Sequence, residues 1–483
     1  MVVEVDVLVI GCGPAGLIAA DRLSDAGARV LLVDAGRGHT RRVCPVDRGR
    51  ECHGCRGICN TVAGFGGCIH YGDGVKLSRF PSGRRLAELL GGERGLRLET
   101  AALHRLCGTV LPEFRGSVGA APWPVKDYPV ASLTSAQVRA VIDGLHNRLL
   151  SRPSIDLRTG TEVRALAPHA GGRWQAQLLD RRGSEDRVRA RAVVAAVGRW
   201  GREWWHAQIR TLGLRFDPPA PSVGVRFECP AALLAAGAGV HADFKTTLVR
   251  SGVKIKTFCF CAGPGGGRIK FTDYPAGPDG GYTLLDGHVI AEPAHGATAN
   301  FALLAQLRDE DGRAWDSTRI ATDLLAPYRA LRPDRPGKPV LQWFPDFKAR
   351  ELTCTSLPEF SAISGVTPSV RDYRMANLAS ILPSEVHAAL VEAFTDLAGF
   401  FTGGADPAWC QRQVGVIGLE LENTWDVMDL SASLQTSAPG LYAVGDATGL
   451  AQGIVAAATG GLAAAEHIVS TSLSTPVTEG LLR

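Results

Sequence analysis

The first forty residues change from a strand pattern to a helix pattern and back. Val3, Val5 and the run 7–10 are apolar and mostly β-branched, as a buried parallel strand requires. Residues from about 14 to 26 fit a helix, and Gly27 is the residue type that commonly ends one. A second apolar run, 29–33, ends at Asp34. The pattern predicts a strand, a helix and a second parallel strand at the start of an α/β fold.

Three glycines follow the first strand at a spacing that suits phosphate binding. Gly11 permits a tight turn, Gly13 lets the backbone approach a pyrophosphate, and Gly16 lets the helix pack closely on the strand. The amides and the positive dipole end of the helix would face the phosphates. The first residues of that helix are Pro14 and Ala15. Asp34 could accept hydrogen bonds from ribose hydroxyls, so a dinucleotide is the expected ligand.

A second cofactor-binding segment is predicted near the C-terminus. The strand pattern of residues 441–444 is followed by Gly445 and Asp446, and then by a small-residue helix that begins at Gly453 and Ile454. Asp446 suits hydrogen bonding to a flavin ribityl chain, and the helix start can face the flavin pyrimidine. The two segments lie roughly 400 residues apart, and no second glycine fingerprint for NAD(P)H is visible. FAD is therefore the expected cofactor.

The chain is long enough for two or three substructures. The predicted fold class is α/β: a discontinuous, Rossmann-like FAD-binding domain of the glutathione-reductase type, with an inserted mixed α+β substrate domain. A buried strand pattern at 188–197 ends in Gly198, which is expected to belong to a second flavin-binding motif. The expected division is 1–75, 151–204 and 436–470 for the FAD-binding domain, 76–150 for a helical insertion, 205–435 for the substrate domain and 471–483 for a tail.

Charge and composition narrow the range of partners. The 52 Lys and Arg residues nearly balance the 48 Asp and Glu residues and are dispersed, which does not indicate nucleic-acid binding. No apolar run reaches the length of a transmembrane segment, and no basic leader precedes the first strand. We expect a cytoplasmic enzyme with a small-molecule substrate. Its 12 cysteines are then expected to be thiols, metal ligands or redox groups rather than structural disulfides.

One arginine-rich loop holds a group of cysteines. Cys44, Cys52, Cys55 and Cys59 could close around zinc or an iron–sulfur cluster, and the nearby arginines would lower the thiol pKa values. A cluster would pass single electrons to the flavin, whereas zinc would only brace the loop. Two alternatives stay open. One is a Cys55–Cys59 dithiol that exchanges electrons with the flavin, and the other is a set of free cysteines that line a loop near FAD.

The glycine-rich segment after this loop resembles a known family. Residues 62–77 read Val-Ala-Gly-Phe-Gly-Gly-Cys-Ile-His-Tyr-Gly-Asp-Gly-Val-Lys-Leu and are similar to its GFGGAG…SDGK signature. Later segments resemble further family elements: 222–228, 257–259 with 263–266, 286–288, 299–302 and 445–455. The family consists of poorly characterised FAD-dependent dehydrogenases, distantly related to geranylgeranyl reductases and electron-transfer-flavoprotein dehydrogenases. The resemblance implies the same fold and cofactor, with Gly66 and Gly67 beside FAD, and it names no shared reaction.

Three residues are the candidate catalytic groups. His70 and Tyr71 stand where the signature has other residues, and His70 could act as an acid or tether the flavin covalently. Packing beside the cofactor without chemistry is the alternative for His70. Cys259 lies in one family-like element, and on a strand its thiol would face the same side as that of Cys261. A role in the core is the alternative for this pair.

The expected reaction is hydride transfer between flavin N5 and a C–C or C–N bond of a small organic substrate, catalysed by a dehydrogenase or reductase. A flavin-dependent monooxygenase is the enzymatic alternative. However, residues 198–201 read Gly-Arg-Trp-Gly, not the Asp-Gly motif that the aromatic hydroxylases use. A non-catalytic flavoprotein that relays electrons to a partner through the cysteine loop is the second alternative. The loop 64–76 is expected to lie against the flavin, because its glycines allow a close backbone approach.

Overall fold

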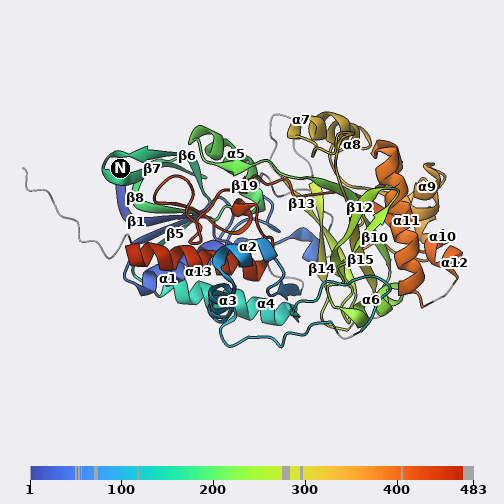
Figure 1. Cartoon of the computed structure of the whole chain (residues 1–483), viewed down its shortest axis with the longest axis horizontal. Coiled ribbons are helices and arrows are strands. Elements are labelled where there is room, and N and C mark those ends of the chain that lie inside the picture. Colours follow the sequence, from blue (N-terminus) through green and yellow to red (C-terminus); the bar gives the residue numbers. More distant parts are fainter. Residues whose placement is uncertain are drawn as a thin grey trace, which may run out of the picture.

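The computed structural model describes residues 2–48, 50, 52, 55, 57–69, 74–117, 119–274, 283–293, 297–403 and 406–471. Within these residues the chain forms a mixed α/β fold around two large sheets, one mainly parallel and one mainly antiparallel. Figure 1 shows the first sheet and its helices on the left and the second on the right.

The first sheet draws its strands from distant parts of the chain. In the described part it has the order β5-β2-β1-β8-β7-β6, and β20 also pairs with β8. The strands β5, β2, β1, β8 and β20 are parallel, whereas β7 and β6 add an antiparallel ribbon. The strands are β1 (Val2–Ile10), β2 (Val30–Asp34), β5 (Ile155–Thr159), β6 (Thr161–His169), β7 (Arg173–Asp180), β8 (Glu185–Ala195) and β20 (Leu441–Ala443). The ends of β1 and β8 are buried on both faces, which explains their continuous apolar runs.

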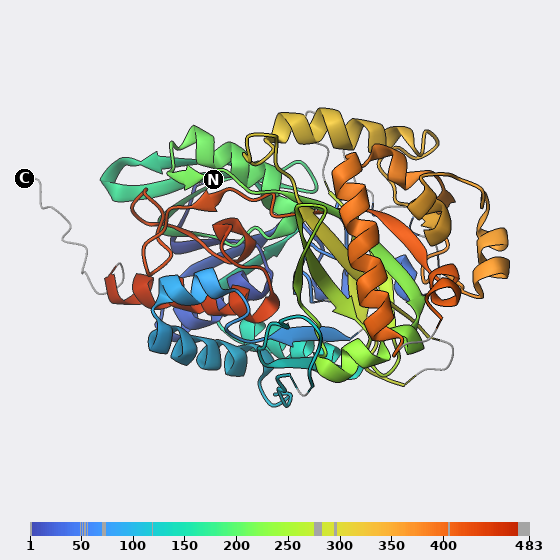
Figure 2. The ribbon, with the colours of Figure 1, turned by 45° about the vertical axis from the view of Figure 1, so that its right-hand side comes forward.

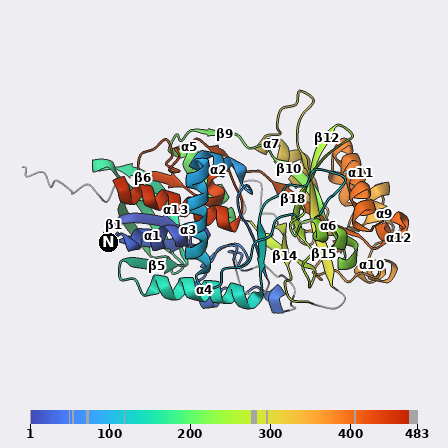
Figure 3. The ribbon, with the colours of Figure 1, turned by 60° about the horizontal axis from the view of Figure 1, so that its bottom comes forward.

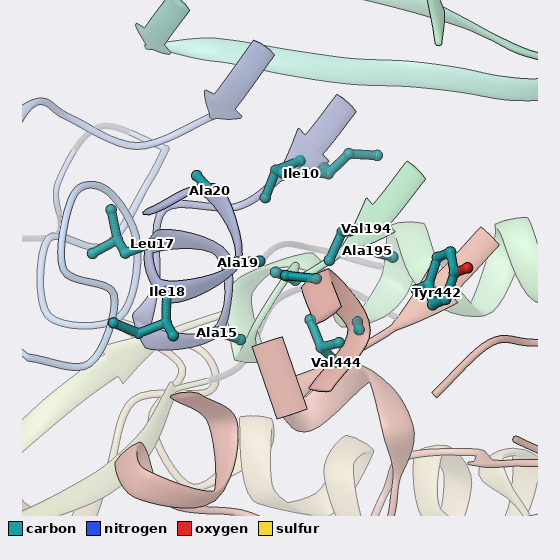
Figure 4. Packing of buried hydrophobic residues seen from close by; sticks show 14 of the residues in the cluster. Ile10, Ala15, Leu17, Ile18, Ala19, Ala20, Val194, Ala195, Tyr442 and Val444 are labelled. Atoms are coloured by element: carbon teal, nitrogen blue, oxygen red, sulfur yellow. The ribbon is translucent and has the colours of Figure 1, made fainter. Parts of the chain in front are cut away.

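The first and last described helices pack against each other beneath this sheet. A Cβ at Gly461 of α13 would lie 2.0 Å from the carbonyl oxygen of Ala15, so the two backbones touch. Figure 4 shows small side chains of α1, including Ala15 and Ala19, on the side that faces the strand residues Val194 and Val444. Figure 3 shows α3 and α4 in the same layer of helices. The helices of this part of the chain are α1 (Pro14–Asp25), α2 (Arg84–Leu90), α3 (Gly92–Cys107), α4 (Ser135–Leu150) and α13 (Ile454–Thr471), with α5 (Arg202–Thr211) on the other side of the sheet (Figure 1).

Helix α13 is long and apolar enough to cross a bilayer, but 61% of its apolar window is buried inside the protein. This burial is typical of a core helix and accounts for its composition of small residues. The helices that the sequence predicts over 84–90 and 135–150 are confirmed as α2 and α4. Helix α4 begins with a capping box in which Thr134 and Gln137 bond each other's backbone.

The second sheet carries the other large core. Its order in the described part is β11-β12-β15-β10-β18-β16-β17. Figure 2 shows α11 lying along the outer face of this sheet, where the rings of Phe227, Phe301 and Phe394 stack. The strands are β10 (Ser222–Pro230), β11 (Thr247–Arg250), β12 (Val253–Cys261), β15 (Thr298–Gln306), β16 (Val340–Trp343), β17 (Arg374–Met375) and β18 (Gly415–Glu422). The helices are α6 (Ala235–Val240), α7 (Ser317–Ile320), α8 (Ala326–Ala330), α9 (Phe344–Ala349), α10 (Leu357–Ser364), α11 (Ser384–Phe401) and α12 (Pro407–Arg412).

Short strand pairs lie between and beside the two sheets. They are β3 (Val75–Ser78) with β4 (Val130–Leu133), β9 (Phe216–Asp217) with β19 (Val427–Met428), and β13 (Gly267–Asp273) with β14 (Thr283–Val289). Strands β3 and β14 matter most for function because both lie beside the cavity described next.

Candidate active site

A large cavity of about 1390 Å³ lies between the two sheets. Its walls include the turn after β1, the end of β8 and the start of α13 on one side. On the other side they include β3, β12 and β14. Concave sites of this kind between substructures are the usual place for a cofactor and its substrate.

The glycines of the β1–α1 turn have two different roles. A Cβ at Gly11, where φ is +110°, would lie 2.2 Å from the carbonyl oxygen of Ala196. A Cβ at Gly16 would lie 1.9 Å from the carbonyl oxygen of Gly11. A Cβ at Gly13 would meet nothing closer than the Cα of Gly67, at 3.8 Å, and Gly13 lines the cavity. Gly11 and Gly16 therefore serve backbone packing, whereas Gly13 leaves room for a phosphate at the helix start.

Asp34 holds the cofactor loops together. Its carboxylate accepts hydrogen bonds from the backbone amides of Cys12 (2.7 Å), Gly36 (2.6 Å) and Gly64 (3.0 Å). A carboxylate has about four acceptor positions, so one stays available for a ribose hydroxyl. Asp34 also lines the cavity, which is compatible with the ribose contact that the sequence predicts.

A buried arginine organises the glycine-rich loop at residues 60–69. The guanidinium of Arg42 donates through Nε to Asn60, through Nη1 to Phe65 and Ile69, and through Nη2 to Thr61 and Gly67, always to backbone carbonyl oxygens. All five N–H groups are thereby used. The loop in turn places Gly67 against Gly13, and the amide of Gly66 donates to the carbonyl oxygen of Cys12 (2.8 Å).

The remaining predicted cofactor residues meet at the same cavity. Those that line it are Gly11, Gly13, Pro14, Ala15, Asp34, Gly67, Gly198, Gly445, Asp446, Gly453 and Ile454. Gly16 and Gly66 are not part of its lining and act through backbone packing instead. Two chain segments that are far apart in sequence therefore build one binding site, as FAD requires. When bound, FAD would supply the hydride chemistry of its isoalloxazine ring.

Replacing Asp446 with asparagine should change how the stability of the flavin-free protein depends on pH. Burial raises the pKa of Asp446 to about 6, while Arg199 opposes this shift and Glu422 adds to it. The stability contributed by this carboxyl is therefore complete below about pH 4 and is lost as pH rises through about 6. Relative to Asp446→Asn, the wild type should lose about 1–2 kcal/mol of unfolding free energy between about pH 4 and 7. Parallel pH profiles of the two proteins in denaturant titrations would contradict this.

The opposite wall of the cavity holds a buried ion pair. The Nζ of Lys76 in β3 donates to Asp243 and to the carbonyl oxygen of Phe260, at 2.5 Å each. Tyr128 donates its hydroxyl to the same carboxylate (2.7 Å), and Lys245 lies 2.9 Å from it. Burial opposes ionisation of both partners, but the opposite charges raise the pKa of Lys76 and lower that of Asp243. Both groups are therefore charged and fix the wall.

Lysines form a cationic strip on this wall. Lys126, Lys245 and Lys256 line the cavity, and backbone pairing brings them together. The amide of Lys126 donates to the carbonyl oxygen of Lys245 (2.8 Å), and Thr247 pairs with Lys256 across β11 and β12. Burial lowers the pKa of Lys126 and Lys256, and the positive charges of neighbouring lysines lower both further. An anion bound here would relieve that repulsion.

Cys259, a predicted catalytic residue, lies on the same wall together with Cys261. Trp200 and Trp204 also line the cavity, whereas Trp205 is buried and donates its indole N–H to the carbonyl oxygen of Ala447 (3.0 Å). The predictions for His70 and Tyr71 lie outside the described residues.

The four cysteines of the predicted metal site, Cys44, Cys52, Cys55 and Cys59, are all described, and Cys55 lies near the other three. No three metal-ligating side chains of the described residues are arranged to hold an ion. Cys44 and Cys52 pack into an apolar cluster with Phe271, and the thiol of Cys59 lies 4.0 Å from the carbonyl oxygen of Phe271. Cys59 is also buried and hydrogen-bonds with Cys55, which lowers the pKa of Cys55 to about 7. The zinc or iron–sulfur site therefore stays a prediction, beside the two thiol interpretations.

No sequence motif marks Asp243, Tyr128 or the lysine strip. These residues lie in segments without a motif, and only the pairing of β11 with β12 and the packing of β3 against β14 bring them to the cavity. The sole signal was the density of lysines in residues 245–256, which becomes informative once the strands are known.

Comparison with known proteins agrees with the cofactor site. Residues 4–51 match the family described as FAD binding domain. An uncharacterized protein of Clostridium beijerinckii is 23% identical over 477 residues, which cover 96% of this chain and 80% of that protein.

Two solved structures are similar over nearly the whole chain. A flavoprotein/dehydrogenase from Cytophaga hutchinsonii shares 13% identity with a TM-score of 0.40, covering 98% of this chain and 80% of that one. A geranylgeranyl bacteriochlorophyll reductase-like protein from Thermoplasma acidophilum shares 12% identity with a TM-score of 0.41, at the same coverages of 98% and 80%. The match to the FAD-binding family confirms the predicted cofactor: the chain carries an FAD-binding domain and is an FAD-dependent oxidoreductase.

Proposed function

We propose that this FAD-dependent oxidoreductase is a cytoplasmic dehydrogenase or reductase that acts on a C–C or C–N bond of a small anionic substrate. The observation that carries the proposal is Lys256, a half-buried lysine of lowered pKa in the cavity that the FAD-binding loops share. A lysine whose pKa is lowered by burial gives up its proton more readily than a free lysine, which suits it to proton transfer. Its neighbours Lys126 and Lys245 favour a substrate that carries a carboxylate or phosphate.

In this proposal the charged residues of the cavity wall have three different roles. Lys126 and Lys245 attract and orient the anionic group, and the ion pair of Lys76 with Asp243 fixes the wall. Lys256 gives or takes the proton that accompanies hydride transfer. Flavin N5 supplies or accepts the hydride when FAD is bound.

The test is anaerobic reduction of the enzyme-bound flavin by candidate substrates, followed as loss of the yellow colour. Carboxylate-bearing compounds should reduce it faster than their neutral amides. Lys256→Met should lower the rate of flavin reduction by about 10²–10⁴-fold without changing the FAD content. Lys254→Met is the matched control, because this exposed lysine lies on the same strand outside the cavity lining and should leave the rate within a few-fold of the wild type.

Two results would overturn the proposal. The first is a product that forms only when both oxygen and a nicotinamide donor are present, which would identify a monooxygenase. The second is equal loss of rate in Lys256→Met and Lys254→Met, which would remove Lys256 from the chemistry.

A further inference from the structure

Two cysteines of β12 form a close pair on the cavity wall. The Sγ atoms of Cys259 and Cys261 lie 3.7 Å apart, and both residues line the cavity. The pairing of β12 with β15 is irregular between Phe258 and Cys261, as at a β-bulge, and Cys259 has a φ of +47°. Phe260 points the other way and is buried in the core. A positive φ at a non-glycine residue costs free energy and is found most often at functional sites.

The surroundings of the pair separate the two thiols chemically. Cys261 donates its S–H to Cys259, and the positive charges of Arg226 and Lys76 add to this effect, so the pKa of Cys259 falls well below its usual value despite burial. The same hydrogen bond and burial raise the pKa of Cys261. Arg226 is fixed beside the pair because it bonds Glu420 (2.6 Å) and the carbonyl oxygen of Cys259 (3.3 Å). Cys259 is therefore the more acidic thiol of the pair and the better nucleophile.

The other cysteines of the site do not combine a neighbouring thiol, a lowered pKa and a place in the cavity lining. Cys68 also lines the cavity, but the pKa of its thiol is raised rather than lowered. Cys55 and Cys59 form a pair, but neither lines the cavity. Strand β14 approaches the pair closely at Gly287, where a Cβ would lie 2.9 Å from the Sγ of Cys261.

We propose that Cys259 and Cys261 are a redox-active dithiol that passes electrons between the flavin and a small-molecule disulfide entering the cavity. Cys259 is the attacking thiolate and Cys261 is the resolving thiol. The inference concerns a second reaction at the same cavity and does not depend on the identity of the organic substrate.

The exchange between the dithiol and one disulfide molecule balances in atoms and electrons. The Cys259 thiolate attacks one sulfur of the disulfide, R–S–S–R, so that the S–S bond breaks, R–S⁻ leaves and a mixed disulfide forms. R–S⁻ takes the proton of Cys261, whose thiolate then attacks the sulfur of Cys259 and releases the second R–S⁻. The substrate gains two electrons, and the pair becomes a disulfide. A reduced flavin would supply the two electrons and one proton that restore the thiolate and the thiol.

Peptide mapping of the holoprotein tests the pair directly. Trypsin cuts after Lys256 and Arg268, so one peptide, residues 257–268, contains both cysteines. Cys55 and Cys59 fall in different peptides, because Arg56 separates them. After exposure to oxidised glutathione and then to iodoacetamide, the 257–268 peptide should lack two hydrogens and carry no label. After reduction it should carry two labels.

Serine variants test the assigned roles. In Cys261→Ser, Cys259 should remain as a mixed disulfide with glutathione, whereas in Cys259→Ser, Cys261 should stay largely unmodified. Cys68→Ser is the cavity control and should behave like the wild type. In anaerobic titrations, the oxidised wild type should take up about two more electrons per chain than oxidised Cys259→Ser before its flavin is fully reduced.

Three results would overturn the proposal. They are a 257–268 peptide that stays fully labelled after excess oxidised glutathione, equal modification of both serine variants, and equal electron uptake by wild type and Cys259→Ser. The wild-type mapping decides the question even if a serine variant fails to fold. These results do not depend on whether an organic substrate reduces the flavin. Either proposal can therefore be contradicted while the other stands.

Discussion

Replacing Gly13 with valine should give a folded protein that purifies without its yellow colour. The side chain would enter the cavity where the helix start faces the phosphates, and the protein itself offers no atom closer than 3.8 Å to the new Cβ. We expect the affinity for FAD to fall by at least about 100-fold, equivalent to about 2.7 kcal/mol. The unfolding free energy of the flavin-free protein should change by no more than about 1 kcal/mol. Flavin absorbance of the purified protein and titration with FAD measure the first effect, and denaturant unfolding measures the second.

Two further glycines serve as controls for this experiment. Gly144 lies in α4 with open space around its Cβ position, so Gly144→Val should keep the colour and the stability. Gly16→Ala should instead destabilise the flavin-free protein, because the new Cβ would lie 1.9 Å from a backbone oxygen. A yellow Gly13→Val protein with unchanged affinity would show that the phosphates lie elsewhere.

Replacing Arg42 with methionine should both destabilise the protein and weaken FAD binding. The change leaves five hydrogen bonds to backbone carbonyl oxygens unmade, around a side chain that is 3% exposed. Each buried acceptor without a donor costs about 1–3 kcal/mol, and partial relaxation reduces the sum, so we expect a loss of about 3–5 kcal/mol. Because the loop places Gly67 against Gly13, the FAD content should fall as well. Denaturant unfolding and flavin absorbance measure the two effects.

A change at the neighbouring Arg41 distinguishes the loss of the Arg42 hydrogen bonds from the loss of a positive charge. Arg41 is exposed, and Arg41→Met removes the same charge without affecting the loop, so it should retain stability and colour. Arg42→Lys keeps the charge but has three donors in place of five, and it should fall between the wild type and Arg42→Met. If Arg41→Met and Arg42→Met are equally destabilised, the loop does not depend on the Arg42 hydrogen bonds.

The sequence was sufficient to predict the cofactor half of the site because its signals are local. The turn at Gly11, the helix that follows it and the strand that ends at Asp34 each depend on neighbours within a few residues. The C-terminal segment with Asp446 was recognisable for the same reason, since strand, turn and helix follow one another directly.

The substrate half could not be predicted in this way because it depends on long-range pairing. Asp243 is significant only because Lys76, 167 residues earlier in the chain, pairs with it on the same wall of the cavity. The surroundings of the cysteine loop could not be predicted for a related reason. Spacing shows which thiols could meet, but not that Phe271, more than 200 residues later, takes part in the apolar cluster that holds Cys44 and Cys52.

The packing of α13 on α1 also has a consequence for how the cell makes the enzyme. The ribosome completes the Gly16 turn 438 residues (454 − 16) before it reaches Ile454, the first residue of α13. At about 5–20 residues per second, the nascent chain spends roughly 20–90 s with only one side of its flavin site. Because the site draws on both ends of the chain, we expect FAD to bind only after α13 has been synthesised and packed on α1.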